Sequence, residues 1–220
     1  MVNNPSLDPA DNNSLAGALR FAFSKMIQNV QGMLPAQVIS YDRDNNRVNV
    51  QLLISLLTTS GASVPRPQLA SIPVAVFGGG GFLLSFPLNA GDLGWVIAND
   101  RDISNFLSTY SMSTPNTNRI CQFADGVFIP DAMRGYTISG GNAGAVVLQN
   151  TAGTVCVAVN DTDVTITAAQ TVTVNAGHNV NINATANSVM TLAGGLGTFG
   201  VVGNITATGS ITPSTPPPPP

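Results

Sequence analysis

The sequence has little charge and an uneven choice of charged residues. Only 9% of its 220 residues are charged, none of them is glutamate, and Lys25 is the only lysine. A formal net charge of -3 provides no basic surface for a nucleic-acid backbone, so nucleic acid is not an expected partner. The absence of glutamate removes the commonest glycosidase acid. A hydrophobic content of 44% nevertheless indicates a chain that folds around a core.

Residues that carry metal or covalent chemistry are also scarce. Cys121 and Cys156 have no paired cysteine or histidine nearby, so they indicate two ordinary thiols of a reducing compartment rather than a zinc or redox site. His178 is the only histidine, and nothing pairs a nucleophile with a base. The N-terminus lacks a signal-peptide pattern, and no apolar run approaches the about 20 residues of a membrane helix. We therefore expect no enzyme activity, no metal and no cofactor.

The charges divide the chain into two unlike halves. All eight basic residues lie at or before Arg134, whereas the residues after it carry only Asp161, Asp163 and the neutral His178. The second half is rich in Gly, Ala, Thr, Asn and Val, and it ends in five consecutive prolines. This difference predicts two kinds of structure.

The N-terminal part predicts one amphipathic helix. Apolar residues recur in steps of three or four from Leu15 to Met33, with possible N-caps at residues 11–14 and a stop at Gly32 and Pro35. Such a helix either packs on its own domain or docks onto a partner. The residues that we expect to contact a partner are Leu15, Leu19, Phe23 and Met26.

From Ala36 the apolar period changes to two, which predicts strands. A hairpin is expected around the turn 42–46, followed by strands at 72–77, 82–88 and 94–98. About five short strands separated by Gly, Pro and Asp turns are typical of a small Greek-key barrel of the OB type. Pro73 indicates an edge or bulged strand. The glycine run 78–81 indicates a close turn rather than a phosphate loop, and residues 100–102 are expected to form a solvated turn.

Residues 164–195 form blocks of eight: VTITAAQT, VTVNAGHN, VNINATAN and SVMTLAGG. The register holds over the first three blocks, and Val155, Val157 and Val159 alternate similarly upstream but out of phase. Each block predicts a short strand with inward apolar side chains at alternate positions and a corner of small or polar residues. His178 falls in such a corner, where an exposed turn histidine is favoured over a metal ligand. The expected inward residues are Val164, Ile166, Val172, Val174, Val180 and Ile182.

A repeat this short cannot bury its narrow apolar face within one chain, so it must stack. Three chains winding about a common axis would each supply one face of a triangular prism, which also removes open sheet edges. The fold expected from the sequence is therefore all-β: a helix, an OB-fold barrel and an intertwined trimeric β-helix with octapeptide repeats. Its segments are an arm and helix (1–35), the barrel (36–112), a connector (113–138), a needle (139–200) and a tip (201–220).

The segment IPVAVFGGGGFLLSFPLNAGDLGWVIANDRDISNF (72–106) resembles the OB domain of phage baseplate central spike proteins, the membrane-puncturing tips of contractile tails. FADGVFIPDAMRG (123–135) is similar to the connector of that family. The resemblance implies a homotrimer with a collar on the tail hub and a needle that breaches the host outer membrane mechanically, located at the baseplate tip of the virion and assembled in the host cytoplasm. The His-x-His that holds an iron ion at the tip of many members is absent here.

The last residues form the expected tip. An uncharged end avoids the large cost of carrying charge into hydrocarbon, and a proline run is a stiff, extended segment; a flexible tail is the alternative. The tip residues are Pro216, Pro217, Pro218, Pro219 and Pro220. Rival interpretations of the whole chain are a trimeric receptor-binding fibre or adhesin, and the spike of a phage-like bacteriocin or secretion particle.

Overall fold

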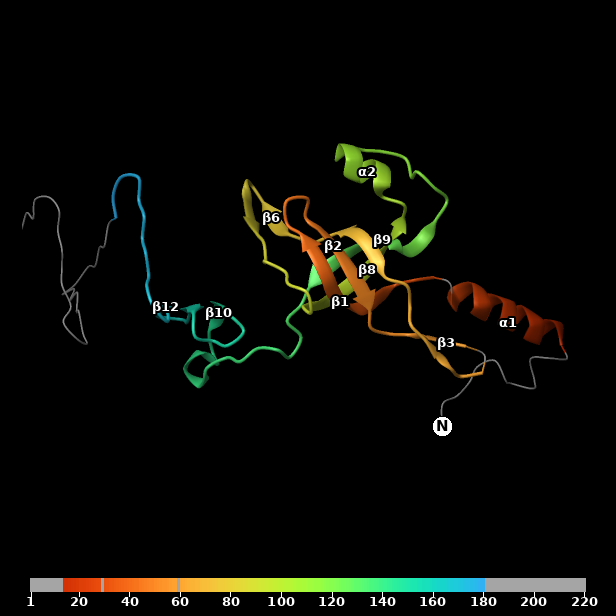
Figure 1. Ribbon diagram of the computed structural model, residues 1–220, viewed down its shortest axis with the longest axis horizontal. Helices are drawn as coiled ribbons and strands as arrows, with labels where there is room; N and C mark the ends of the chain where they lie inside the picture. Colours follow the sequence, from red (N-terminus) through yellow and green to blue (C-terminus); the bar gives the residue numbers. More distant parts are fainter. Residues whose placement is uncertain (1–13, 29, 59, 181–220) are drawn as a thin grey trace, which may run out of the picture. The chain divides into compact units, whose positions relative to one another are not determined.

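The computed structural model describes residues 14–28, 30–58 and 60–180 (Figure 1). The chain divides into two units between Val172 and Thr173. Strands outnumber helices in the described residues. The elements are α1 (Leu15–Gln28), β1 (Met33–Asp42), β2 (Arg47–Leu52), β3 (Leu56–Leu57), β4 (Ser63–Val64), β5 (Leu69–Pro73), β6 (Phe77–Gly79), β7 (Phe82–Leu84), β8 (Leu93–Arg101), α2 (Ser104–Thr109), β9 (Ile120–Pro130), a 3-10 turn (Gly140–Asn142), β10 (Val146–Gln149), β11 (Cys156–Val159) and β12 (Val164–Thr167).

The main structure is a nearly closed barrel. Its five strands lie in the order β5-β2-β1-β8-β9, and every neighbouring pair is antiparallel. The two ends of the sheet meet where Val74 forms a parallel bridge with Phe128, and Ala75 N donates a 2.8 Å hydrogen bond to Phe128 O. This order, with its parallel closure, is that of an OB-like Greek-key barrel. The all-β, OB-like part of the predicted fold is therefore confirmed.

The barrel encloses an aliphatic core with two phenylalanines. Alternate residues of β2 are buried, as the period of two predicts, because successive side chains point to opposite faces of a strand. Phe128 fills the centre and is fully buried. Gly94 on β8 makes room for it, since a Cβ there would overlap the Phe128 ring and the carbonyl oxygen of Ile129. The core residues are Ala36, Val38, Val48, Val50, Leu52, Ile72, Val74, Val96, Phe123 and Phe128.

The helix is shorter than its sequence pattern predicts. α1 ends at Gln28, and Met33, placed by the sequence at the end of the helix, is the first residue of β1. Met33 and Leu34 pair with Ile97 and Val96 of β8. Gly32 O accepts a hydrogen bond from Ala98 N and so extends this pairing. The chain leaves the helix early because the backbone of β8 offers partners to residues 32–34.

β9 corrects the expected connector. The sequence pattern assigns residues 113–138 to a link between domains, but β9 lies within them and pairs with β8. The pairing extends from Arg101 opposite Ile120 to Gly94 opposite Pro130. Its buried residues are Phe123, Asp125, Gly126 and Phe128, so the alternation shifts by one position between Asp125 and Gly126. The barrel thus needs this strand for both its core and its closure. The sequence conceals β9 because Asp125 and Gly126 interrupt its apolar pattern.

Two expected strands become a separate hairpin. The strand predicted for 72–77 ends at Pro73, on edge strand β5, as the proline indicated. Phe77 begins β6, which pairs only with β7, the remnant of the strand predicted for 82–88. Gly80 and Gly81 form the turn with φ angles of 60° and 86°, which glycine adopts readily. The glycine run is therefore a tight hairpin turn.

Beyond the barrel, β10, β11 and β12 form a three-stranded antiparallel sheet. β12 is the strand of the first octad. Upstream, where the alternation is out of phase with the octads, Cys156 and Ala158 are buried, whereas Val155, Val157 and Val159 are exposed. Within the described part of the octads, residues 168–180 contain no helix or strand. The remaining octads, from residue 181, lie outside the described residues.

Candidate functional site

The predicted partner-binding stripe lies on α1 and is exposed. Leu15, Leu19, Phe23 and Met26 are between 50% and 79% exposed. Steps of three and four place them along one side of the helix. Phe21 points to another side, where the Lys25 Nζ atom lies 5.4 Å from its ring centroid. The helix therefore offers an apolar stripe that the described chain does not cover.

The predicted trimer-core residues are exposed in the single chain. Val164 and Ile166 lie on β12, while Val172, Val174 and Val180 lie in the non-strand segment that follows. All five expose more than half of their surface. Ile182 and the tip prolines Pro216 to Pro220 lie outside the described residues. The repeat thus has apolar side chains without a covering surface in the described chain.

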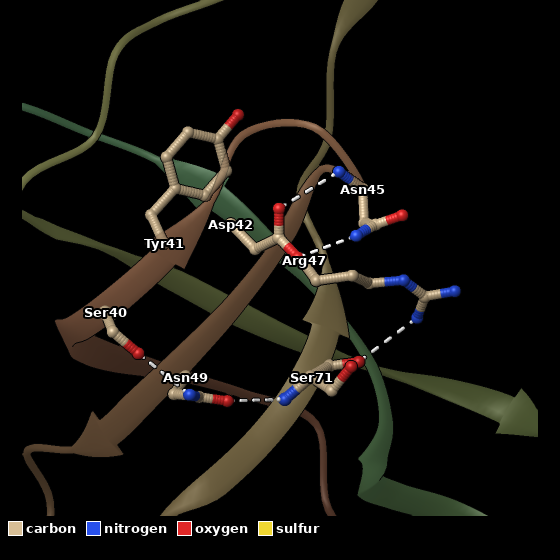
Figure 2. A pocket seen from close by; sticks show the side chains of 7 residues that line it. All are labelled: Ser40, Tyr41, Asp42, Asn45, Arg47, Asn49 and Ser71. Atoms are coloured by element: carbon tan, nitrogen blue, oxygen red, sulfur yellow. Dashed lines mark hydrogen bonds between the residues drawn. The ribbon is translucent and has the colours of Figure 1, made fainter.

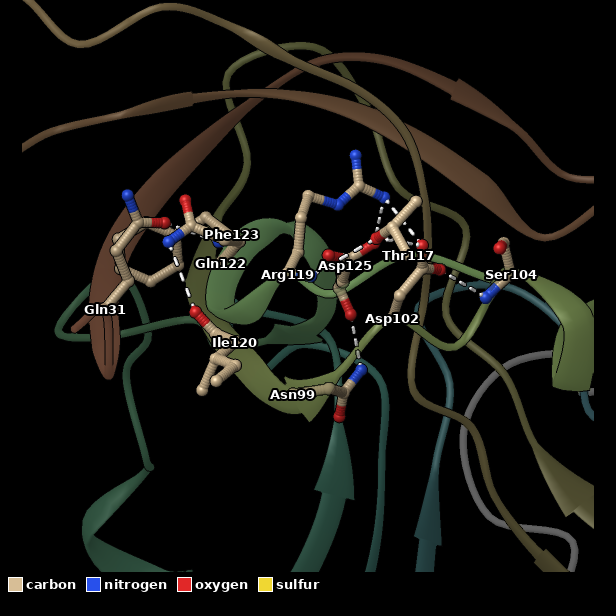
Figure 3. A network of polar contacts seen from close by, with 10 residues as sticks. All are labelled: Gln31, Asn99, Asp102, Ser104, Thr117, Arg119, Ile120, Gln122, Phe123 and Asp125. Atoms are coloured by element: carbon tan, nitrogen blue, oxygen red, sulfur yellow. Dashed lines mark hydrogen bonds and ion pairs between the residues drawn. The ribbon is translucent and has the colours of Figure 1, made fainter. Parts of the chain in front are cut away.

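A polar network lies where the loop between β8 and β9 leaves the barrel (Figure 3). The Arg119 Nη2 atom lies 3.1 Å from Asp102 Oδ2 and 2.7 Å from Asp125 Oδ1. Thr117 Oγ1 donates to Asp102 Oδ2 at 2.7 Å, and Ser104 N donates to Asp102 Oδ1 at 2.9 Å. The Asp102 side chain is completely buried. The expected solvated turn at residues 100–102 is therefore wrong for Asp102, because this loop folds over it.

This network holds Asp102 as a carboxylate. Hydrogen bonds from Ser104 are the main reason why the pKa of Asp102 lies well below its usual range, and the Thr117 hydroxyl and the Arg119 charge lower it further. Burial acts in the opposite direction. A carboxylate so fully occupied as an acceptor is suited to fixing the loop and unsuited to proton transfer. The sequence could not reveal it, because Asp102 and Arg119 are 17 residues apart.

The network continues toward the chain that enters β1. Asn99 Nδ2 donates to the backbone oxygen of Asp125 at 2.5 Å. Gln31 N donates to Cys121 O at 3.0 Å, and Gln31 Oε1 accepts from Phe123 N at 2.5 Å. These bonds attach the segment after α1 to the start of β9 (Figure 3).

A shallow depression of about 570 Å³ lies over β1, β2 and β5 (Figure 2). Its polar groups bind one another: Asn49 connects Ser40 with Ser71, and Arg47 Nη1 donates to Ser71 O at 3.1 Å. Asn45 donates to both Asp42 oxygens and is the main reason why the pKa of Asp42 is lowered. With its polar groups satisfied and no nucleophile beside a base, this depression offers no catalytic arrangement. Its residues are Ser40, Tyr41, Asp42, Asn45, Arg47, Asn49 and Ser71.

Two other protruding segments carry exposed apolar residues. On the β6–β7 hairpin, Phe77 and Phe82 are largely exposed. In the segment between β8 and β9, Tyr110 and Met112 are exposed. The Phe106 and Tyr110 rings are arranged edge to face, with their centroids 5.9 Å apart. Sequence reasoning did not single out either segment for binding. Such surfaces are typical of proteins that work in assemblies.

Among the residues that the structure describes, no group of three His, Cys or Asp side chains is placed to hold a metal ion. None of the helices in that part of the chain is long and apolar enough to span a membrane.

Residues 34–131 match the model of the family described as Phage protein Gp138 N-terminal domain. The matched range runs from the second residue of β1 to the residue after β9, so it coincides with the barrel. No curated protein matches the chain. The family match supports a phage protein, and thereby a structural component of the virion.

Proposed function

We propose that this chain is the central spike of a contractile phage tail baseplate, which attaches to the tail hub and pierces the host outer membrane during injection. The observation that carries the proposal is the order of parts along the chain. A barrel that matches a phage-protein family is followed by β12 and a repeat with apolar side chains left bare in one chain. A barrel attached to a stacked repeat is the organisation that a collar with a needle requires.

The proposed action is mechanical, without bond chemistry. Three chains would place the octad valines and isoleucines on a common axis, so that interchain backbone hydrogen bonds and a continuous core make the needle stiff. Force from sheath contraction would then act on a small area. The near absence of charge after Arg134 suits a surface that enters a membrane.

Sedimentation of the purified full chain tests the trimer. We expect a homotrimer whose folding and association are coupled. A folded monomer would overturn the proposal. Labelling the C-terminus and imaging intact particles tests the location, and we expect the label at the tip of the baseplate.

The hub contact is proposed for the exposed α1 stripe together with the barrel. Phe23→Ser removes a ring from that stripe, whereas Phe21→Ser removes the same ring from another side of the helix. We expect Phe23→Ser to reduce incorporation into particles and Phe21→Ser to leave it unchanged. Equal incorporation of both variants would mean that the stripe does not hold the hub.

The spike of a phage-derived bacteriocin or secretion particle is the second candidate, because it would need the same collar and needle. Purification of the particle separates them: a spike from a particle with a DNA-filled capsid belongs to a phage. A receptor-binding fibre would instead place the C-terminal label away from the tail axis.

A further inference from the structure

The sheet β10-β11-β12 has two unlike faces. In an antiparallel pair, residues directly opposite each other have side chains on the same face. Leu148 pairs with Val157, which pairs with Ile166; Val146 pairs with Val159, which pairs with Val164. One face of the sheet, here called the branched face, therefore carries only large aliphatic side chains: Val146, Leu148, Val157, Val159, Val164 and Ile166.

The opposite face is covered by its own chain at β11. It carries Cys156, 4% exposed, and Ala158, fully buried. Asn142 Nδ2 lies 3.5 Å from Cys156 Sγ, and Gln149 Nε2 donates to Thr137 O at 2.7 Å. Residues 137–142 thus pack against the face with the small side chains. The sheet has a preferred inner side within one chain, and the six residues of the branched face are not on it.

The branched face has no cover in the described chain. Its six side chains are between 36% and 78% exposed. A three-stranded sheet needs packing on an apolar face to be stable, and contiguous apolar patches are uncommon on monomers. Some other surface must therefore occupy the branched face.

We propose that the same face of two further copies of this chain covers it, so that β10, β11 and β12 form the first layer of the trimer core. This inference rests on the homotrimer of the proposed function, in which only the octads form the trimer core. It deepens that proposal because it extends the interface upstream to Val146 and assigns association to a sheet with a defined register.

Two features favour copies of the same chain over another partner. First, the branched face contains no polar or charged side chain, so identical faces can meet without burying like charges. The nearby Asp161 and Asp163 lie outside the face, in the connection between β11 and β12, where Asn160 N donates to Asp163 O. A charged or polar partner surface would gain nothing from such a face.

Second, the face is continuous along the chain with the repeat. β12 is at once the third strand of this sheet and the strand of the first octad, so Val164 and Ile166 belong to both. Val172, Val174 and Val180 follow, and each of them is also more than half exposed. Copies that associate through the octads would therefore bring their branched faces to the same axis.

The test uses the full chain and one cross-strand pair at the middle of the face. Val157→Asp with Ile166→Asp places charge on the branched face, whereas Thr165→Asp places it on the neighbouring, exposed position of the other face. We expect loss of the trimer in sedimentation for the first variant and an unchanged trimer for Thr165→Asp. Alkylation of Cys156, with Cys121 as the reference thiol, reports whether the sheet remains folded.

If the aspartate substitutions unfold the sheet, a pair of cysteine variants tests whether the branched face lies at the trimer interface. Under mild oxidation, Ile166→Cys should give covalent dimers, because identical residues meet at the axis, while Thr165→Cys should give none above the wild-type background. Equal cross-linking in both variants would overturn the inference. The inference would also be overturned if the thiol introduced by Ile166→Cys were protected from alkylation but formed no cross-link. That result is expected if residues 181–220 of the same chain cover the face.

The two proposals fail differently. A wild-type monomer removes both. A wild-type trimer that survives Val157→Asp with Ile166→Asp while Cys156 stays protected leaves the octad-based trimer intact and removes the branched face from the interface.

Discussion

The barrel and the three-stranded sheet have similar strand sequences, but the alternating valines are buried in the barrel and exposed on the sheet. Both consist of antiparallel strands in which valine alternates with other residues. In the barrel, Val48 and Val50 are at most 1% exposed, whereas Val157 and Ile166 of the sheet are 36% and 59% exposed. The same alternation therefore leads to a filled core in one region and a bare face in the other.

Closure explains the difference. Five strands can curl until β5 meets β9, and each inward side chain then faces another within the same chain. Three short strands cannot close, so their second face stays open unless another molecule covers it. We infer that the core of the barrel is complete within one chain and that the core of the needle is completed only on association, which makes the two regions separable by mutation.

The largest expected effect comes from the barrel core. Phe128→Ala removes a fully buried ring, which typically costs about 3–5 kcal/mol in free energy of unfolding. Trp95, the only tryptophan, lies on β8, and its Nε1 donates to Asp131 Oδ2 at 2.7 Å, so its fluorescence reports on the barrel. Urea unfolding followed through Trp95 measures the loss.

Phe77→Ala is the matched control, since Phe77 is 64% exposed on the β6–β7 hairpin. It should change the unfolding midpoint little. In Phe128→Ala, Cys156 should stay protected from alkylation if the two regions are separable; simultaneous loss of protection would show that they fold as one.

A smaller effect is expected at Gly94. Gly94→Ala places a Cβ against the Phe128 ring and the Ile129 carbonyl, and overpacking of this kind costs about 1–3 kcal/mol. Gly79→Ala has open space around its Cβ and serves as the control. In urea unfolding followed by Trp95 fluorescence, the midpoint of Gly94→Ala should lie below that of Gly79→Ala. Equal midpoints would mean that the barrel can shift to admit a methyl group.

The sequence predicted the barrel well but not its last strand. The period of two in β2 and the proline on β5 were sufficient to indicate short strands and an edge. β9 was missed because Asp125 and Gly126 interrupt its pattern, and both are explained only by tertiary partners: Arg119 binds Asp125, and a Cβ at position 126 would approach Ile97 O and Phe123 O. Local pattern cannot record such distant partners.

The candidate surfaces were predicted in part. Helical spacing identified the α1 stripe, and the structure leaves it exposed. The upstream valines alternate as the octads do, and residues 137–142 cover the face with Cys156 and Ala158 rather than the face with Val157 and Val159. Alternation defines two faces and does not say which of them the chain itself will cover.

Charge offers a third way to separate the regions, through pH. Because the pKa of Asp102 is lowered in the folded barrel, its carboxylate stabilises the fold above about pH 4 and loses this effect as the pH falls toward the folded-state pKa. Asp102→Asn removes the titrating carboxylate, so its unfolding midpoint should fall less between pH 6 and pH 3 than that of the wild type. Protection of Cys156, in a sheet without charge on its faces, should not follow this pH dependence.

The smallest effect is expected at the exposed ion pair beside that network. Arg101 Nε lies 3.6 Å from Asp100 Oδ2, and their side chains are 54% and 80% exposed. Pairs this exposed contribute at most about 1 kcal/mol, because water and salt screen them. Arg101→Met should therefore leave both the Trp95 midpoint and its pH dependence close to wild type. A change in pH dependence as large as that of Asp102→Asn would mean that net charge near the loop, rather than the buried contacts of Asp102, gives the barrel its acid sensitivity.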